Sequence, residues 1–418
     1  MLLHIPPKKL TSSSINISRM KLALIGFGQA GGKIVDKFLE YESQVSGPNV
    51  VVGAMAVNTA KADLMGLEYI PEDNRVLIGQ DKVKGHGVGA DNELGAEIAE
   101  RDVQEIHNKL DRIETSKVDA FLIVAGLGGG TGSGGMPVLA KSVKRIYTEP
   151  VYSLGILPSE DEGGIYSLNA ARSFQQVVEQ SDNTILFDNN SWAQTGESMG
   201  EGYEYMNTEL VKRMYMLFSA GEVIGGDTVG ESVVDASEII NTLGSGGIST
   251  IGFAETQLSE DEIPGRGGLL SRFRNTEPEI GDSSRNINRI TSVIRKAALG
   301  RLTHPAEISG IERALVVIAG PPELLSRKGI EKSRKWIEEE TSSMEVRGGD
   351  YPLEGYDKIA GVVLLSGVTQ SDRIKRLQQI AIEAQETTKE LEEDSKDKLD
   401  ELIDPNTESD DDELESLF

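Results

Sequence analysis

Short apolar runs that alternate with segments of helical periodicity fill the first half of the chain. Leu22–Ile25 is such a run, and apolar residues follow it at helical spacing, namely Ile34, Val35, Phe38 and Leu39. The same alternation predicts further strands at Val51–Val57, Phe121–Ala125, Tyr152–Leu157 and Thr184–Phe187. Strands that alternate with helices form a parallel sheet covered on both faces. Residues 20–195 therefore predict a doubly wound α/β domain, with ligands at the carboxyl ends of its strands.

The second half of the chain has a different pattern. A long helix is predicted at about Gly202–Ser219, and strands are predicted at Ser249–Ala254, Arg313–Ala319 and Lys358–Ser366. A further helix is expected near Leu324–Glu340, whereas Pro264–Ser284 is rich in Gly, Arg and Ser and predicts a loop. These elements predict a smaller α+β domain that follows the long helix.

Both ends of the chain lack these patterns. Residues 1–19 are rich in Pro and Ser, and from about Lys389 the sequence becomes strongly acidic. We therefore expect a disordered arm at 1–19, a first domain with the long helix at 20–220, a second domain at 221–385 and an acidic disordered tail at 386–418. The final residues Leu414–Phe418 are either a docking peptide or a frayed end.

The most informative stretch is Gly128–Gly135 (GGGTGSGG), which lies between a predicted strand and a predicted helix. Glycines let a backbone approach phosphate oxygens closely, and a helix N-terminus adds partial positive charge there. We therefore expect a phosphate cradle at Gly128, Gly129, Gly130, Thr131, Gly132 and Ser133.

A second glycine loop, Gly26–Gly31 (GFGQAG), follows the first strand and matches the GxGxxG dinucleotide pattern. A dinucleotide site also needs an acidic residue after the second strand, which here ends in Asn58. No stretch of the chain fits the GxxxxGK[ST] phosphate loop. Two glycine loops on parallel strands favour a nucleoside triphosphate over the alternative, an NAD-dependent dehydrogenase. The binding residues expected around this loop are Gln29, Ala30, Gly31, Gly32, Lys33 and Asn58.

Composition narrows the classes of function. The net charge of −26 argues against nucleic acid as a partner, because phosphate neutralisation requires a basic surface. The chain has no Cys and four His without paired spacing, which excludes Cys-ligated zinc and disfavours a His-based metal centre. No run of eighteen apolar residues and no leader-like segment is present, so a cytoplasmic protein without membrane insertion is expected. The high negative charge fits either a protein of a salt-rich cytoplasm, where ions screen the repulsion between its charges, or an ordinary acidic protein.

GGGTGSG resembles the signature of the tubulin/FtsZ superfamily, and Gly28-Gln29-Ala30-Gly31 resembles the tubulin form of the first loop. The segment KLALIGFGQAGGKIVDKFLEYE is similar to the CetZ group, tubulin-like proteins of halophilic archaea. This resemblance implies a tubulin/FtsZ-like fold, in which a long central helix joins the GTPase domain to a smaller C-terminal domain. It also implies hydrolysis of GTP to GDP and phosphate, with GTP and Mg²⁺ as ligands.

The resemblance assigns roles to individual residues. Glu162 would accept hydrogen bonds from the ribose, with its two preceding acidic neighbours as alternatives, and Asn189 would serve the ribose or base. Tyr203 would stack on guanine, and Asn207, one helical turn further, would pair with the edge of the base. Gly85–Asn92 would close over the γ-phosphate.

Asp235 and Glu238 resemble the catalytic acids of the superfamily, whereas Val233 stands where FtsZ has Asn. Two acids that only cap a helix are the alternative interpretation. The resemblance implies that these acids act on the GTP of a neighbouring subunit, so that head-to-tail contacts form an open filament.

The implied cellular role is control of cell shape by filaments beneath the membrane, with the acidic tail as the candidate contact for a membrane adaptor. The alternatives are an FtsZ-type division-ring GTPase and a GTP-binding regulator of other filaments that does not polymerise.

Overall fold

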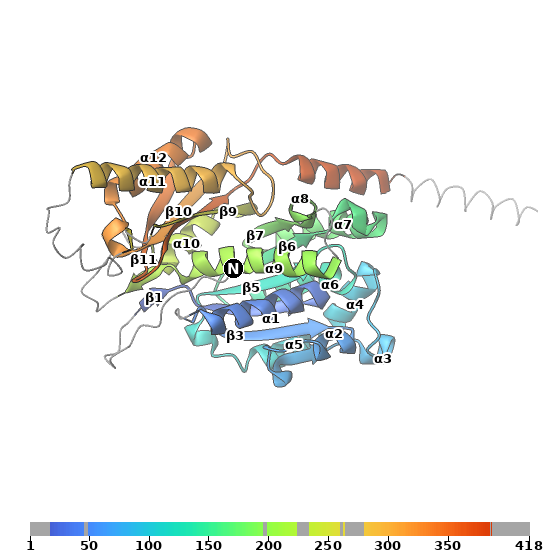
Figure 1. Cartoon of the computed structure of the whole chain (residues 1–418). Coiled ribbons are helices and arrows are strands. Elements are labelled where there is room, and N and C mark those ends of the chain that lie inside the picture. Colours follow the sequence, from blue (N-terminus) through green and yellow to red (C-terminus); the bar gives the residue numbers. More distant parts are fainter. Residues whose placement is uncertain are drawn as a thin grey trace, which may run out of the picture.

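The computed structural model describes residues 17–45, 49–194, 199–223, 234–259, 262–263, 280–384 and 386. Within these residues one sheet of ten strands runs through both halves of the molecule, in the order β11-β10-β12-β9-β7-β6-β5-β2-β3-β4 (Figure 1). Its strands are β2 (Leu22–Phe27), β3 (Val51–Asn58), β4 (Arg75–Leu77), β5 (Ala120–Gly126), β6 (Val151–Leu157), β7 (Asn183–Asp188), β9 (Ile248–Gln257), β10 (Arg313–Gly320), β11 (Glu345–Pro352) and β12 (Lys358–Ser366).

The six strands from β4 to β7 are all parallel, as predicted for five of them, whereas β4 was not predicted. The sheet continues where β9 pairs in parallel with β7, and β12 then lies antiparallel between β9 and β10. The helices are α1 (Gly28–Gln44), α2 (Lys61–Met65), α3 (Gln80–Val83), α4 (Asn92–Arg101), α5 (Val103–Leu110), α6 (Thr131–Ile146), α7 (Gly164–Gln180), α8 (Asn189–Trp192), α9 (Met199–Ser219), α10 (Ala236–Leu243), α11 (Ile280–Leu299) and α12 (Arg327–Thr341). Residues 372–384 are also helical.

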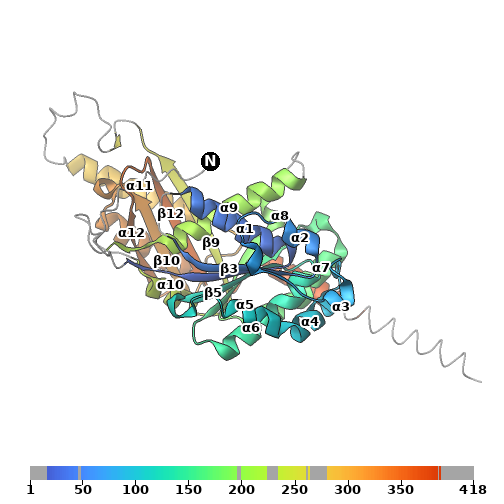
Figure 2. The ribbon, with the colours of Figure 1, turned by 90° about the horizontal axis from the view of Figure 1, so that it is seen from below.

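Successive side chains of a strand point to opposite faces, and helices cover and bury both faces of the parallel sheet. On β2, Leu22 and Leu24 pack with α1 and α9, whereas Ala23 and Ile25 join the core that includes α5, α6 and α7. Figure 2 shows α1 and α9 on one side of the strands and α5 and α6 on the other. Apolar runs without alternation, such as Leu22–Phe27, are the sequence pattern of such strands.

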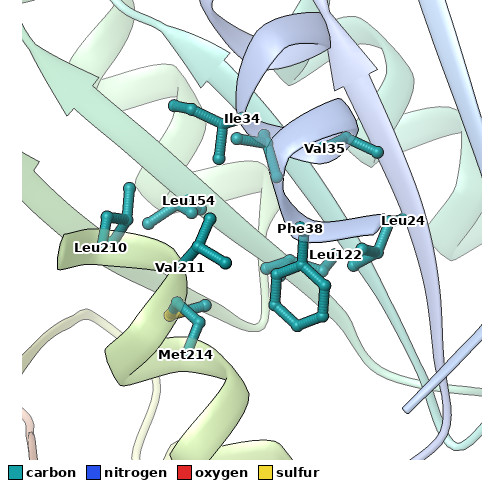
Figure 3. A pocket seen from close by; sticks show the side chains of 10 residues that line it. Leu24, Ile34, Val35, Phe38, Leu122, Leu154, Leu210, Val211 and Met214 are labelled. Atoms are coloured by element: carbon teal, nitrogen blue, oxygen red, sulfur yellow. The ribbon is translucent and has the colours of Figure 1, made fainter. Parts of the chain in front are cut away.

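The layer between α1, α9 and the sheet contains a small cavity of about 10 Å³ (Figure 3). Its lining is entirely apolar and includes Phe38 of α1 and Val211 and Met214 of α9. A space of this size is at the lower limit for a single water molecule, and it offers a water no polar partner. The cavity is therefore a packing gap in the core and is not a ligand site.

The doubly wound sheet, the long helix and the second α+β unit are confirmed. Two expectations need correction. Residues 17–19, at the end of the predicted arm, form β1 (Ile17–Arg19), which pairs with β8 (Gly221–Val223); a three-residue strand whose partner lies far along the chain has no local signature. Residues 280–284, at the end of the predicted loop, begin α11, whose apolar residues face the core.

Residues 1–16 and 264–279, and the predicted acidic tail apart from Glu386, lie outside the described residues. No helix among the described residues has the length and apolar character needed to span a lipid bilayer.

Candidate nucleotide site

The two predicted glycine loops lie side by side, because β2 and β5 are neighbours and end in register at Phe27 and Ala125. Gly28 begins α1 with φ of 74°, a left-handed conformation that favours glycine. A Cβ atom added at Gly28 would lie 2.9 Å from the backbone nitrogen of Gly132. Glycine at these positions therefore lets the two loops touch at the carboxyl edge of the sheet.

The loop from Gly128 to Gly130 leads directly into the N-terminus of α6 at Thr131. A Cβ atom at Gly129 would meet no atom within 4 Å, so this part of the loop faces open space. The buried hydroxyl of Ser133 donates to the Gly129 carbonyl oxygen and thus shapes the loop itself. Open backbone at the start of a sixteen-residue helix provides an anion site.

Side chains that the sequence analysis did not predict complete this loop region. The Thr59 hydroxyl lies 2.7 Å from that of Thr131, and Asn169 donates to the carbonyl oxygens of Gly128 and Ala90 at 3.0 and 2.7 Å. The Gly130 N–H donates to the carbonyl oxygen of Gly89 at 3.2 Å. The segment Gly85–Asn92 therefore packs against the cradle. Thr59 could have been found from its place at the end of a strand, whereas Asn169 lies inside a helix and carries no such signal.

At the first loop, one carboxylate holds two of the predicted amides. Asp63 accepts hydrogen bonds from Gln29 Nε2 and from Asn58 Nδ2, each at 3.1 Å. Gln29 is exposed, and Asn58 is buried. Asp63 follows Asn58 by five residues and was not predicted, because a single Asp on a short helix resembles a surface residue.

The remaining predicted residues of this loop lie within α1. Gly31 packs so tightly that an added Cβ would lie 2.0 Å from the Val124 carbonyl oxygen, and Gly32 is buried against Leu67. Ala30 is half-buried, and Lys33 is exposed. These two glycines therefore let α1 approach the sheet closely beneath the loop.

Glu162, Asn189 and Tyr203 come together from three separate elements. Glu162 Oε1 accepts hydrogen bonds from the Ser159 N–H at 2.8 Å and from Asn189 Nδ2 at 3.3 Å. Burial, and then the charge and hydrogen bond of Glu162, raise the pKa of Tyr203 to about 12. Glu162, Asn189 and Tyr203 thus form one cluster, and Asn207 lies one helical turn after Tyr203 on α9.

Asp235 and Glu238 lie at the start of α10. Asp235 is the N-cap residue, and its side chain accepts a hydrogen bond from the Glu238 N–H at 3.0 Å. Burial raises the pKa of Glu238, although Arg347, 3.9 Å away, opposes this shift. Asp235 therefore caps the helix, and the carboxylate of Glu238 takes no part in this cap. Val233 lies outside the described residues.

These acids and the glycine loops occupy opposite edges of the sheet. The C-terminal end of α10 contacts the first residue of β7, since Asn183 Nδ2 donates to the Leu243 carbonyl oxygen at 2.9 Å. Arg313, the first residue of β10, donates to the Asn241 carbonyl oxygen at 2.5 Å. The amino and carboxyl edges of strands of this length are roughly 20 Å apart. The Glu238 carboxylate lies 3.9 Å from Arg347, the third residue of β11, so it too belongs to the amino edge and is remote from the phosphate cradle of its own chain.

No group of three His, Asp or Glu side chains among the described residues is arranged to hold a metal ion.

Comparisons with known proteins agree with this architecture. A family model described as the GTPase domain of the tubulin/FtsZ family matches residues 21–197, and one described as the C-terminal domain of tubulin-like CetZ matches residues 196–383. The chain is 64% identical to tubulin-like protein CetZ1 of Haloferax volcanii over 374 residues, which cover 89% of this chain and 94% of that protein.

Two solved structures from Haloferax volcanii are similar to most of the chain. The GDP-bound monomer of CetZ1 has a TM-score of 0.76 and 59% identity, and the match covers 88% of this chain and 100% of that one. The GTPγS-bound protofilament of CetZ2 has a TM-score of 0.77 and 44% identity, with the same coverage. Residues 21–197 are therefore a GTPase domain, and the dehydrogenase alternative is wrong. The chain belongs to the CetZ group of the tubulin/FtsZ family.

Proposed function

We propose that this protein binds GTP at the carboxyl edge of its sheet, polymerises head to tail in the cytoplasm and controls cell shape. In this proposal Asp235 and Glu238 of one subunit hydrolyse the GTP held by the next. The observation that carries the proposal is the separation of these acids from the phosphate cradle across the full length of the strands. A site divided in this way needs a second subunit, and repetition of a head-to-tail contact gives an open filament.

The surfaces at the two edges support such a contact. Ile165 and Tyr166, at the start of α7 beside the cradle, are 49% and 37% exposed. Met344, just before β11 at the amino edge, is fully exposed. Apolar side chains at both ends of the molecule are suited to burial between successive subunits.

In the proposed complex, the glycine backbone and the N-terminus of α6 bind the phosphates, with Gln29, Asn58 and Thr131 around them. Glu162 and Asn189 bind the ribose, while Tyr203 and Asn207 bind guanine. Mg²⁺ would join the phosphates at this site, where the neighbouring hydroxyls of Thr59 and Thr131 offer the oxygen ligands that suit it.

A mixing experiment tests the divided site. Glu238→Gln should bind GTP and form persistent polymer without releasing phosphate. Gly129→Val should fold but lose GTP, because its side chain enters the open space at the cradle. Each variant alone should be inactive, and an equal mixture should recover about a quarter of the wild-type phosphate release, since random head-to-tail pairing restores one interface in four.

The wild-type rate per molecule should also rise above a threshold protein concentration. If the mixture stays inactive, or if phosphate release per molecule is independent of concentration, hydrolysis in trans is wrong. The second result would instead support the GTP-binding regulator that does not polymerise.

A further inference from the structure

The helical residues 372–384, which follow β12 of the second half, pack against the first half of the molecule. Leu377 is 1% exposed and belongs to the same apolar core as α6 and α7, and Ile374 and Ile380 pack beside it. Figure 1 shows this helix beside α7 and α8, away from α11 and α12. The end of the described chain therefore returns to the GTPase domain.

Arg373, in the first turn of this helix, is buried and contacts three groups of the GTPase domain. Its Nη2 donates to the Pro158 carbonyl oxygen at 2.6 Å, its Nη1 to Glu160 Oε1 at 3.3 Å and its Nε to Asp188 Oδ1 at 3.2 Å. The side chains of Arg373 and Asp188 are only 6% and 2% exposed. A planar guanidinium is suited to bridging several acceptors in this way.

The three contacted groups belong to the two segments that carry the ribose residues. Pro158 and Glu160 precede Glu162 in the loop after β6, and Asp188 directly precedes Asn189 after β7. A second bridge joins the same segments, since Asn190 Oδ1 accepts a hydrogen bond from the Glu160 N–H at 3.2 Å. Arg373 thus links the loop after β6 to the end of β7, the two segments that carry Glu162 and Asn189.

We propose that Arg373 is a positioning residue for the ribose of the bound nucleotide. It holds the loop after β6 against the end of β7, so that the carboxylate of Glu162 and the amide of Asn189 face the ribose hydroxyls together. The second half of the chain thereby contributes to nucleotide selection through one side chain that does not touch the nucleotide. This inference rests on the proposed GTP site.

Binding of GTP and of 2′,3′-dideoxy-GTP tests the role, because the second nucleotide lacks both ribose hydroxyls. Arg373→Lys keeps a positive charge beside Asp188 but loses the planar fork. The double variant Arg373→Gln with Asp188→Asn removes both buried charges and avoids leaving one of them unpaired. Arg376→Gln, at an exposed position of the same helix, is the matched control.

Wild type and the control should prefer GTP to its dideoxy analogue. Both Arg373 variants should lower the affinity for GTP about tenfold, which corresponds to one lost hydrogen bond to a charged group, and leave dideoxy-GTP binding unchanged. An equal loss for both nucleotides would indicate a merely structural role and overturn the inference, as would wild-type affinities in the variants.

Equal wild-type affinity for the two nucleotides would also overturn the inference, but it would not contradict the proposed binding of the phosphates and the base. A wild-type protein that binds neither nucleotide would instead refute the proposed function. The two failures are therefore distinguishable, and melting temperatures without nucleotide verify that each variant is folded.

Discussion

The glycines around the cradle have two distinct physical roles. Gly31 and Gly135 are packing positions, because an added Cβ would lie 2.0 Å from the Val124 carbonyl oxygen or 2.1 Å from the Phe27 ring. Gly129 is different, since its surroundings are empty within 4 Å. The first role brings helices close to the sheet, and the second leaves room for a ligand.

A pair of alanine substitutions should separate these roles. Gly31→Ala should lower the free energy of unfolding by about 1–3 kcal/mol, because the added methyl group must displace backbone. Gly129→Ala should leave the stability of the nucleotide-free protein unchanged and weaken GTP binding. Thermal unfolding and nucleotide titration measure the two effects. A Gly129→Ala protein that binds GTP normally would contradict the assignment of this space to phosphate.

At the scale of elements, the sequence was informative wherever one strand or helix carried its own pattern. Five of the six parallel strands of the first domain were predictable, because each is a short apolar run, and so were the two glycine loops. The sixth strand, β4, has only three residues and was not predicted. Nor was β11, since Glu345–Pro352 contains charged residues and glycines. Its glycines serve close packing, as a Cβ at Gly348 would lie 2.7 Å from the Val316 carbonyl oxygen. Arg373 and Asp188 are 185 residues apart, so their contact depends on the fold.

The helix that carries Arg373 is also attached through a buried histidine. His304 Nε2 lies 2.7 Å from the hydroxyl of Ser371, and its Nδ1 is buried without a hydrogen-bond partner. Burial, and then the charge of Arg373, lower the pKa of His304 to about 4. A proton on Nδ1 would have no acceptor, so this attachment depends on a neutral imidazole.

Stability should consequently decline in acid. The unfolded chain binds a proton at His304 near pH 6.5, whereas the folded chain binds it only near pH 4. The free energy of unfolding should therefore keep its full value above pH 6.5 and fall by on the order of 3 kcal/mol as the pH falls to 4. In His304→Gln the melting temperature should depend less on pH over this range, whereas in the variant His86→Gln, at an exposed position, it should change with pH as in wild type. Parallel curves for His304→Gln and wild type would contradict the assignment.

For the whole molecule, charge is distributed unevenly. Residues 391–418 contain 13 acidic residues and two lysines, and so contribute −11 of the total charge of −26. Filament assembly brings many such chains together, and salt screens their repulsion within about 3 Å at molar strength. Assembly should therefore depend on the ionic strength.

Deletion of residues 391–418 should lower the KCl concentration at which GTP-dependent light scattering begins. A tail of equal length with its acidic residues replaced by Ser should behave like the deletion, because the effect arises from charge. If the neutral tail behaves like wild type, the length of the tail is responsible and the electrostatic explanation is wrong.

The two halves of the long sheet are joined by two residue pairs between β7 and β9, Thr184 with Ile248 and Ile185 with Ser249. The seam does not act alone, because one apolar core contains residues of both halves, and the helix with Leu377 and Arg373 packs across it. A mechanical load on one half should therefore pass into the other without a hinge between them. In a head-to-tail filament each subunit would then transmit strain from end to end as one stiff body.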